Sequence, residues 1–328
     1  MQSPTWRGSG GFPRMNEYDI IDLLTRMAGR LPAGYSPIGD DVATIPSSPG
    51  RLVLKSDMLV GRTDVPPGMT WRQAGRKAVA MCVSDFASKG AVPQALMVSL
   101  GIPRNLEDHD IRAVARGFRD GMTEWGLNLV GGDTNEADDV IIDCILAGFA
   151  GRIVERSGAS PNELVVVTGE FGTTSAGLKI LLDKASSAPG FRKMALENVY
   201  RPSPRLKLGL ALRDYLTSAM DSSDGLAICL HTLAEASRVG MKIDRLPNRR
   251  ALEKFASDNH YRLDELVLYG GEEYEIVGTV PRNRIAEAEA AAKAAGAGLI
   301  VIGETTGGGG VVTAGGSTIE RRGWVQLS

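Results

Sequence analysis

The chain has 328 residues, about twice the length of a usual domain, so we expect two domains. It carries 37 Lys and Arg against 39 Asp and Glu, and the formal net charge of −2 argues against nucleic acid or an anionic membrane as a partner. No apolar run approaches the ~18 residues that span a bilayer, and the first residues lack the apolar core of a secretory signal, so we expect a cytoplasmic protein.

The first half of the chain shows apolar spacing that alternates between helix and strand. Residues 1–14 are rich in Ser, Gly, Pro and Arg, and we expect a flexible extension there. The predicted elements are a helix over 19–28, a strand over 51–56 ending at Asp57, a helix over 70–88, a strand over 94–102, a helix over 106–125, a short strand over 127–130 that breaks at Gly131-Gly132, and a strand over 140–149.

A polar segment over 151–162 separates the two halves, so we predict an N-terminal α/β domain over 15–150 and a C-terminal α/β domain over 151–328. The second half predicts a strand over 164–168, helices over 175–184, 205–215 and 226–238, a strand over 274–280, a helix over 284–295 and a strand over 299–302. Gly307–Gly310 is predicted to be a loop, either a flexible hairpin or lid or an ordinary exposed connection. The class is α/β or α+β.

Several acidic residues stand beside Gly, Ser or Thr at predicted strand ends or in loops. They are Asp40, Asp41, Asp57, Asp85, Asp133, Asp221 and Asp224, with Glu272 and Glu273 after Gly270-Gly271. Each one alone is typical of a turn or a helix cap, except Asp85, which lies inside an otherwise apolar helix. Together they indicate Mg²⁺, which prefers oxygen ligands, and the adjacent glycines let backbone N–H groups reach phosphate oxygens. Phosphoryl transfer from ATP needs mainly positioning and charge neutralisation, so we expect no covalent protein nucleophile.

Other chemistries find less support in the sequence. The three histidines lack zinc-ligand spacing, no G-x-S-x-G occurs, and the three separated cysteines are typical of small core residues. Residues 172–179 resemble a phosphate-binding Walker A loop but have one residue too many before Lys179. That segment could wrap a phosphate or form a tight strand-to-helix connection, and the second use is the commoner one.

Eight short blocks follow one another along the chain. They are Gly39-Asp40-Asp41, Ser56-Asp57, Ser84-Asp85, Gly131-Gly132-Asp133-Thr134, Arg156-Ser157-Gly158-Ala159, Arg201-Pro202-x-Pro204-Arg205, Asp221-x-Ser223-Asp224-Gly225 and Gly270-Gly271-Glu272-x-Tyr274-Glu275. Their order resembles the thiamine-monophosphate kinase family, in the superfamily of aminoimidazole ribonucleotide synthetase and selenophosphate synthetase. The last block is the one most specific to the kinases.

The resemblance implies a two-domain ATP-binding fold like that of aminoimidazole ribonucleotide synthetase, with the N-terminal domains pairing strands across a homodimer. It implies ATP bound in a cleft with several Mg²⁺ ions, and thiamine monophosphate as the second substrate. The implied reaction is direct in-line transfer of the γ-phosphoryl group of ATP to thiamine monophosphate, which yields thiamine diphosphate.

The resemblance also implies roles for individual residues. The implied metal ligands are Asp41, Ser56, Asp57, Asp85, Asp133, Asp221 and Asp224; the implied ATP contacts are Gly132, Asp133, Arg156 and Ser223; and the implied substrate contacts are Glu272 and Trp324. Two positions depart from the family pattern. Lys55 stands where many bacterial relatives carry Ser or Thr, and Asp64 stands where they carry a histidine. We expect Asp64 to contact the cationic thiazolium ring of the substrate.

Two other readings stay open at this point. One is a superfamily member with another phosphoryl acceptor, and the other is a catalytically silent nucleotide-binding or scaffold protein. Selenophosphate synthetase and the hydrogenase-maturation relative are disfavoured, because the first cysteine is Cys82 and the final residues 324–328 contain none. The full set of aspartates argues against a silent protein.

Overall fold

The computed structural model describes residues 42–47, 50–313 and 316–325. The predicted extension over 1–14, the predicted helix over 19–28 and the predicted metal ligand Asp41 lie outside the described residues. All elements below belong to one compact unit of the chain.

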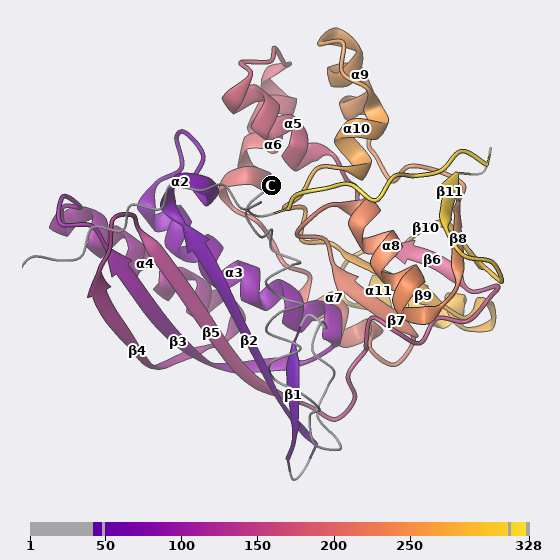
Figure 1. Cartoon of the computed structure of the whole chain (residues 1–328), viewed down its shortest axis with the longest axis horizontal. Helices are drawn as coiled ribbons and strands as arrows, with labels where there is room; N and C mark the ends of the chain where they lie inside the picture. The colour runs from indigo at the N-terminus through magenta and orange to yellow at the C-terminus, as the bar shows by residue number, and fades with distance from the viewer. Residues whose placement is uncertain (1–41, 48–49, 314–315, 326–328) are drawn as a thin grey trace, which may run out of the picture. The chain divides into compact units, whose positions relative to one another are not determined.

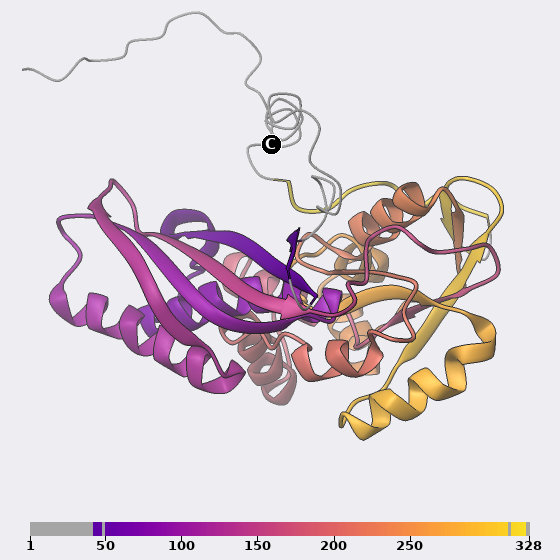
Figure 2. The ribbon, with the colours of Figure 1, turned by 90° about the horizontal axis from the view of Figure 1, so that it is seen from below.

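The first half forms a five-stranded sheet in the order β1-β2-β5-β3-β4 (Figure 1). Its strands are β1 Ala43–Pro46, β2 Arg51–Val60, β3 Val92–Ile102, β4 Asn128–Glu136 and β5 Ile141–Ala150. Its helices are α2 Gly61–Asp64, α3 Trp71–Lys89 and α4 Asp108–Trp125. Neighbouring strands are antiparallel except β3 and β4. Helices α3 and α4 cover one face of this sheet (Figure 2).

The second half forms a six-stranded sheet in the order β11-β8-β10-β6-β9-β7. Its strands are β6 Leu164–Val167, β7 Ser218–Asp221, β8 Gly240–Ile243, β9 Ile276–Val280, β10 Ile300–Thr306 and β11 Val311–Thr313. Its helices are α5 Thr173–Leu182, α6 Pro189–Tyr200, α7 Leu206–Leu212, α8 Leu226–Ser237, α9 Arg250–Asp258, α10 Leu263–Leu268 and α11 Ile285–Ala294, with a 3₁₀ turn η1 at Arg282–Arg284. The mixture of sheets and helices in both halves confirms the predicted class.

Helix α3 connects the two halves, and the sequence fixes both of its ends. Thr70 Oγ1 accepts a hydrogen bond from the Gln73 backbone N–H, and Gln73 Oε1 accepts one from the Thr70 N–H, which is a capping box. The helix ends at Gly90, whose φ of 65° favours glycine. Between these ends α3 is buried on almost all sides, against α4, β2 and β5 and against α7 and β7 of the second half. Its polar side chains therefore lie inside the molecule.

Each half has an apolar core of its own. Cys82 and Cys144 lie in the core between the first sheet and its helices, and Cys229 lies in the core of the second sheet. All three thiols are free and buried, which confirms their prediction as small core residues. No helix in the described part of the chain is long and apolar enough to cross a bilayer.

Two strands run further than predicted. β2 does not end at Asp57, because its ladder with β5 continues without interruption from Arg51↔Ala150 to Val60↔Ile141. β4 does not break at Gly131-Gly132, because glycine lets this edge strand approach β3 closely: a Cβ atom on Gly132 would lie 2.1 Å from the carbonyl oxygen of Val98. Gly307–Gly310 is an exposed connection between β10 and β11, which confirms the predicted loop.

Candidate active site

A lysine lies between two of the carboxylates predicted to bind metal. Successive side chains of a strand point to opposite faces, so Lys55 and Asp57 of β2 share the face that α3 covers. The Lys55 Nζ atom lies 3.0 Å from Oδ2 of Asp85, on α3, and 3.8 Å from Oδ2 of Asp57. The Lys55 side chain is 22% exposed and that of Asp85 is 6% exposed. With the buried Asp221 at the end of β7, these residues form a group that we call the acidic centre.

The charges of the acidic centre act strongly on one another. Burial disfavours the Lys55 ammonium, but the negative charges of Asp85 and Asp57, with a smaller contribution from Asp221, raise its pKa well above the usual range. Burial raises the pKa of the Asp57 carboxyl, and the Lys55 ammonium acts in the opposite direction. Lys55 is therefore a fixed positive charge, and Asp57 would still gain from a further cation.

The Gly-Gly-Glu loop before β9 lies against the loop that follows β7. The Glu272 backbone N–H donates to the carbonyl oxygen of Ser223 at 2.7 Å, and a Cβ atom on Gly271 would lie 2.5 Å from that oxygen. Glu272 itself has a φ of 61°, a backbone conformation that non-glycine residues seldom adopt and that clusters at functional sites. The two predicted site residues Ser223 and Glu272 are thus held together by the backbone.

A buried lysine of α3 joins this loop to the first half of the chain. Lys77 Nζ lies 2.5 Å from Glu272 Oε1 and donates to the Asp64 carbonyl oxygen at 2.9 Å. The Lys77 side chain is 1% exposed. Asp64 Oδ2 accepts a hydrogen bond from the Val60 backbone N–H at 2.7 Å, so one oxygen of that carboxylate fixes the start of α2. Lys77 brings the two predicted substrate residues Asp64 and Glu272 to the same region.

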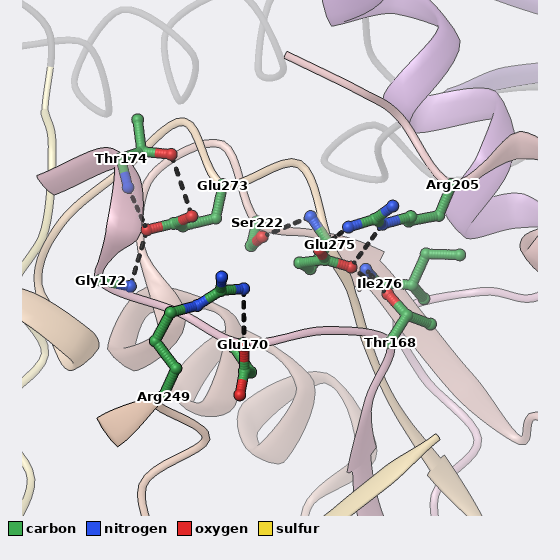
Figure 3. Close-up of polar contacts among 10 residues, drawn as sticks. All are labelled: Thr168, Glu170, Gly172, Thr174, Arg205, Ser222, Arg249, Glu273, Glu275 and Ile276. Atoms are coloured by element: carbon green, nitrogen blue, oxygen red, sulfur yellow. Dashed lines mark hydrogen bonds and ion pairs between the residues drawn. The ribbon is translucent and has the colours of Figure 1, made fainter. Parts of the chain in front are cut away.

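Two further glutamates of the same loop are held by hydrogen bonds (Figure 3). Glu273 accepts from the backbone N–H groups of Gly172 and Thr174 and from the Thr174 hydroxyl. Burial raises the pKa of Glu273 to about 7, although these three hydrogen bonds act to lower it. Glu275 accepts from the Arg205 guanidinium and from the Thr168 hydroxyl, and it is nearly inaccessible to solvent.

The Walker-like segment serves as a tight strand-to-helix connection. Gly172, with a φ of 89°, caps α5, and its N–H donates to Glu273 rather than pointing to open space. The Thr174 N–H has the same acceptor. Of the two uses that the sequence left open, the structure has the commoner one.

Trp324 lines a cavity of about 620 Å³ beside the Gly-Gly-Glu loop. The cavity is also lined by Tyr269, Gly270 and Gly271, and the Arg322 guanidinium lies 4.0 Å from the centre of the Tyr269 ring. The Trp324 backbone N–H donates to the carbonyl oxygen of the predicted metal ligand Asp224 at 3.0 Å. Trp324 and Glu272 therefore border neighbouring parts of the same surface.

Other predicted residues lie apart from the acidic centre. The sheet register places Asp133 opposite Ser99 and Ser99 opposite Asp143, on the face away from α3, and the Ser56 hydroxyl donates to Asp143 Oδ1 at 2.6 Å. Ser56 and Asp133 thus share one face, while Asp57 lies on the other. Gly132 lies within β4. The carbonyl oxygen of Arg156 accepts from the Ser237 hydroxyl in a connection before β6.

The half-buried Lys55 and the buried Lys77 and Lys89 were not predicted as site residues. Lys89 is fully buried on α3 and donates from Nζ to the Ala219 carbonyl oxygen of β7 at 2.6 Å. Three lysines among the small and apolar residues of a buried helix or a half-buried strand are unusual, because lysine is almost never buried without a partner. A lysine in such an apolar segment is the signal in the sequence that could have identified these three residues.

The donor chemistry of this region fits Mg²⁺. Asp57, Asp85 and Asp221 supply hard carboxylate oxygens in a partly desolvated setting, and burial leaves Asp57 short of positive charge. Among the residues described, no three acidic, His or Cys side chains lie close enough together to hold one ion. Divalent ions would thus share carboxylates here with water and phosphate oxygens, which is the usual mode for Mg²⁺.

Comparison with known proteins places the chain in a family. Residues 39–150 match the AIR synthase related protein N-terminal domain, and residues 160–315 match the C-terminal domain of the same family. The thiamine-monophosphate kinase of Nitrosopumilus maritimus is 38% identical over 272 residues, which cover 83% of this chain and 84% of that one. The chain belongs to the thiamine-monophosphate kinase family. The family member from Pyrococcus abyssi is 36% identical over 319 residues, 96% of each chain.

Solved structures of this family have the same fold. The structure described as AaThiL complexed with AMPPCP and TMP has a TM-score of 0.86 and 26% identity, and the match covers 97% of this chain and 99% of that chain. The thiamine monophosphate kinase from Aquifex aeolicus has a TM-score of 0.80 and 25% identity, covering 93% and 100%. Hydrogenase maturation protein HypE of E. coli, at 22% identity and a TM-score of 0.69, shares the fold.

Proposed function

We propose that the chain phosphorylates thiamine monophosphate with ATP and so forms thiamine diphosphate. The observation that carries the proposal is the acidic centre of Asp57, Asp85 and Asp221, which β2, α3 and β7 assemble from both halves of the chain. The proposal gains support from family membership and from the relative whose structure contains AMPPCP, a non-hydrolysable analogue of ATP, together with TMP.

Mg²⁺ is the cofactor that we infer for the acidic centre. Asp57, Asp85 and Asp221 would each supply oxygen ligands to such ions, shared with water and phosphate oxygens, with Asp41 and Asp224 as further expected ligands. When bound, the ions neutralise the charge of the transferring phosphoryl group and of both substrates, which are anions. The role of the protein is to bind and orient the substrates. Its carboxylates fix the cations, and no side chain forms a covalent bond to phosphate. Ser56 and Asp133 stay predicted ligands on the opposite sheet face, with Gly132, Arg156 and Ser223 as predicted ATP contacts.

The cavity beside Trp324 is the place that we assign to the thiamine part of the substrate. An indole and the Tyr269 ring offer apolar faces on which the thiamine rings can stack, and Glu272 lies at the adjoining end of the loop. Asp64 brings negative charge, which a cationic thiazolium ring favours, and Glu272 lies in the same region in an ion pair with Lys77. Lys77 contacts both residues and holds them in place.

The direct test is product identification with purified protein, ATP and Mg²⁺. With thiamine monophosphate present, we expect ADP and thiamine diphosphate in equal amounts, and with EDTA added we expect neither. ADP formation that requires a different phosphoryl acceptor in place of thiamine monophosphate would favour a superfamily member with that acceptor. No nucleotide consumption with any acceptor would favour a silent nucleotide-binding protein.

We also infer that two copies of the chain pair through the first sheet. The sheet face away from α3 exposes Met58, Met97 and Phe149, and the edge strand β4 is exposed along its length and adds Leu129 and Val130. A sheet face with several exposed apolar side chains beside an uncovered edge strand is typical of surface that another chain covers. The resemblance implies a homodimer, and one apolar face can pair with its own copy about a twofold axis.

A further inference from the structure

The proposed reaction gives no role to Lys55, although its ammonium lies in the acidic centre. Its Nζ atom is 3.0 Å from a carboxylate oxygen of Asp85 and 3.8 Å from one of Asp57. Asp85 comes from a helix and Asp57 from a strand, so the ammonium connects two elements that the fold has already fixed. Two carboxylates facing one another in a partly desolvated place repel each other unless a cation lies between them.

A divalent ion and the Lys55 ammonium cannot both lie at that point. Nζ already takes the space next to Asp85 Oδ2, and an ion held by the same oxygen would face a like charge at short range. The lysine brings one positive charge against two negative ones, so Asp57 and Asp85 keep one net negative charge for other cations. A serine at position 55 would remove both the ammonium and its stem, and would leave the two carboxylates without their bridge.

We propose that the Lys55 ammonium takes the place of one divalent cation between Asp57 and Asp85. The chain consequently binds one Mg²⁺ fewer per subunit than the same chain with a short hydroxyl side chain at position 55. Lys55 acts through the two carboxylates and is a positioning residue. The inference rests on the proposed function only in that it requires the acidic centre to bind divalent cations.

The test counts bound ions and does not depend on turnover. Mn²⁺ replaces Mg²⁺ as a paramagnetic probe, AMPPCP is present, and the electron paramagnetic resonance signal of free Mn²⁺ gives the number bound per chain. We expect K55S to bind one more Mn²⁺ than the wild type, and K55R to bind the wild-type number because it keeps the charge. Equal numbers in K55S and wild type would overturn the proposal.

A second lysine gives a matched control. Lys254 Nζ lies within 3.0 Å of both carboxylate oxygens of Asp258 on the exposed face of α9, away from the acidic centre. K254S therefore removes a lysine that pairs with an aspartate, and we expect its Mn²⁺ number to equal that of the wild type. A gain of one ion in K254S as well would overturn the proposal, because the extra ion would not report on position 55.

Folding is measured in parallel by thermal unfolding with and without Mn²⁺. We expect Mn²⁺ to raise the Tm of K55S more than that of the wild type, because the ion replaces the lost bridge. K55T, whose β-branched side chain suits a strand, is the second variant. Failure of both variants to fold in saturating Mn²⁺ would contradict the proposal. If the wild type binds Mn²⁺ and K55S binds the same number of ions, this proposal alone is wrong. If neither protein binds Mn²⁺, the proposed function is contradicted as well.

Discussion

Lysine side chains hold the carboxylates of the candidate site in place. Lys55 lies between Asp57 and Asp85, and Lys77 contacts Glu272 and the backbone of Asp64. A buried lysine that loses its partner leaves an uncompensated charge, so these contacts restrict where the carboxylates can lie. At the scale of single residues, the site is a set of carboxylates fixed by internal cations.

Replacing Asp57 tests the acidic centre at its most accessible carboxylate. We expect D57N to lower turnover at least about 100-fold, because a neutral amide holds Mg²⁺ poorly and preorganised charge is lost. We expect its Tm to stay close to that of the wild type, since Asp85 still pairs with Lys55 at 3.0 Å. D258N, at the exposed partner of Lys254, is the control and should keep wild-type turnover. Near-normal turnover in D57N would contradict a role of this carboxylate in metal binding.

Asp64 offers a separate test of substrate contact. One of its oxygens accepts from the Val60 N–H, and asparagine can keep that acceptor while it removes the charge. We expect D64N to raise the KM for thiamine monophosphate several-fold and to leave the KM for ATP unchanged, because only the thiamine part is cationic. Steady-state kinetics with each substrate varied in turn give the two values. An equal change in both, or in neither, would rule out a contact between Asp64 and the thiazolium ring.

The acidic residues of the site were predicted from the sequence, whereas the partners of the lysines that hold them were not. Asp57, Asp85 and Asp221 each stand in a short block with Gly, Ser or Thr, and such blocks are visible along the chain. Lys55 pairs with Asp85, which is 30 positions away in the sequence, and Lys77 pairs with Glu272, which is 195 positions away. Only the packing of α3 against both halves brings these charges together.

At the scale of elements, helices with clear local end signals were predicted closely, whereas several short strands and two helices were missed. The helix predicted over 70–88 is α3 over 71–89, because Thr70 and Gly90 mark its ends locally. The four-residue strands β1 and β8 and the helices α6 and α9 were not predicted. Strands this short are determined by pairing with distant neighbours, such as β8 with β10, and local propensity is too weak to reveal them.

The N-terminus of α5 carries a pH-dependent contribution to stability. The pKa of Glu273 is about 7 in the folded chain, against a usual 4.5, so folding favours the protonated form. The contribution of the Glu273 carboxyl to the free energy of unfolding is complete below pH 4.5 and is lost as the pH rises to about 7. A glutamine at position 273 keeps all three hydrogen bonds, because its amide N–H can donate to the Thr174 hydroxyl, which then acts as the acceptor. We expect E273Q to gain stability relative to the wild type by about 1–3 kcal/mol between pH 5 and pH 8. Urea unfolding of both proteins gives the difference, and the same difference at both pH values would contradict the raised pKa.

At the scale of the whole molecule, α3 connects the two sheets. Lys89 donates to the carbonyl oxygen of Ala219, and Arg76 donates to the carbonyl oxygen of Pro202 while it pairs with Glu124 of α4. These contacts bring the end of β7, with Asp221, to the carboxylates of β2 and α3. The residues of the two halves that we propose as metal ligands therefore depend on one buried helix for their positions.

The inferred dimer predicts a specific weak point. Met97 lies on the exposed face of the first sheet, and a charge there would be costly to bury. We expect the wild type to have the mass of a dimer in light scattering coupled to size-exclusion chromatography, and M97D to shift to the monomer. Leu182, an exposed apolar residue of α5 outside this sheet, gives the control L182D, which should remain dimeric. A monomeric wild type, or a fully dimeric M97D, would contradict pairing through this face.

We propose that the acidic centre directs the γ-phosphoryl group of ATP to thiamine monophosphate. A single-turnover experiment with γ-³²P-labelled ATP, Mg²⁺, thiamine monophosphate and excess protein tests it most directly. We expect the label to appear in thiamine diphosphate with wild type, and we expect this product to be lost with D57N. Label that appears only as free phosphate, or transfer to thiamine monophosphate that D57N leaves unchanged, would contradict it.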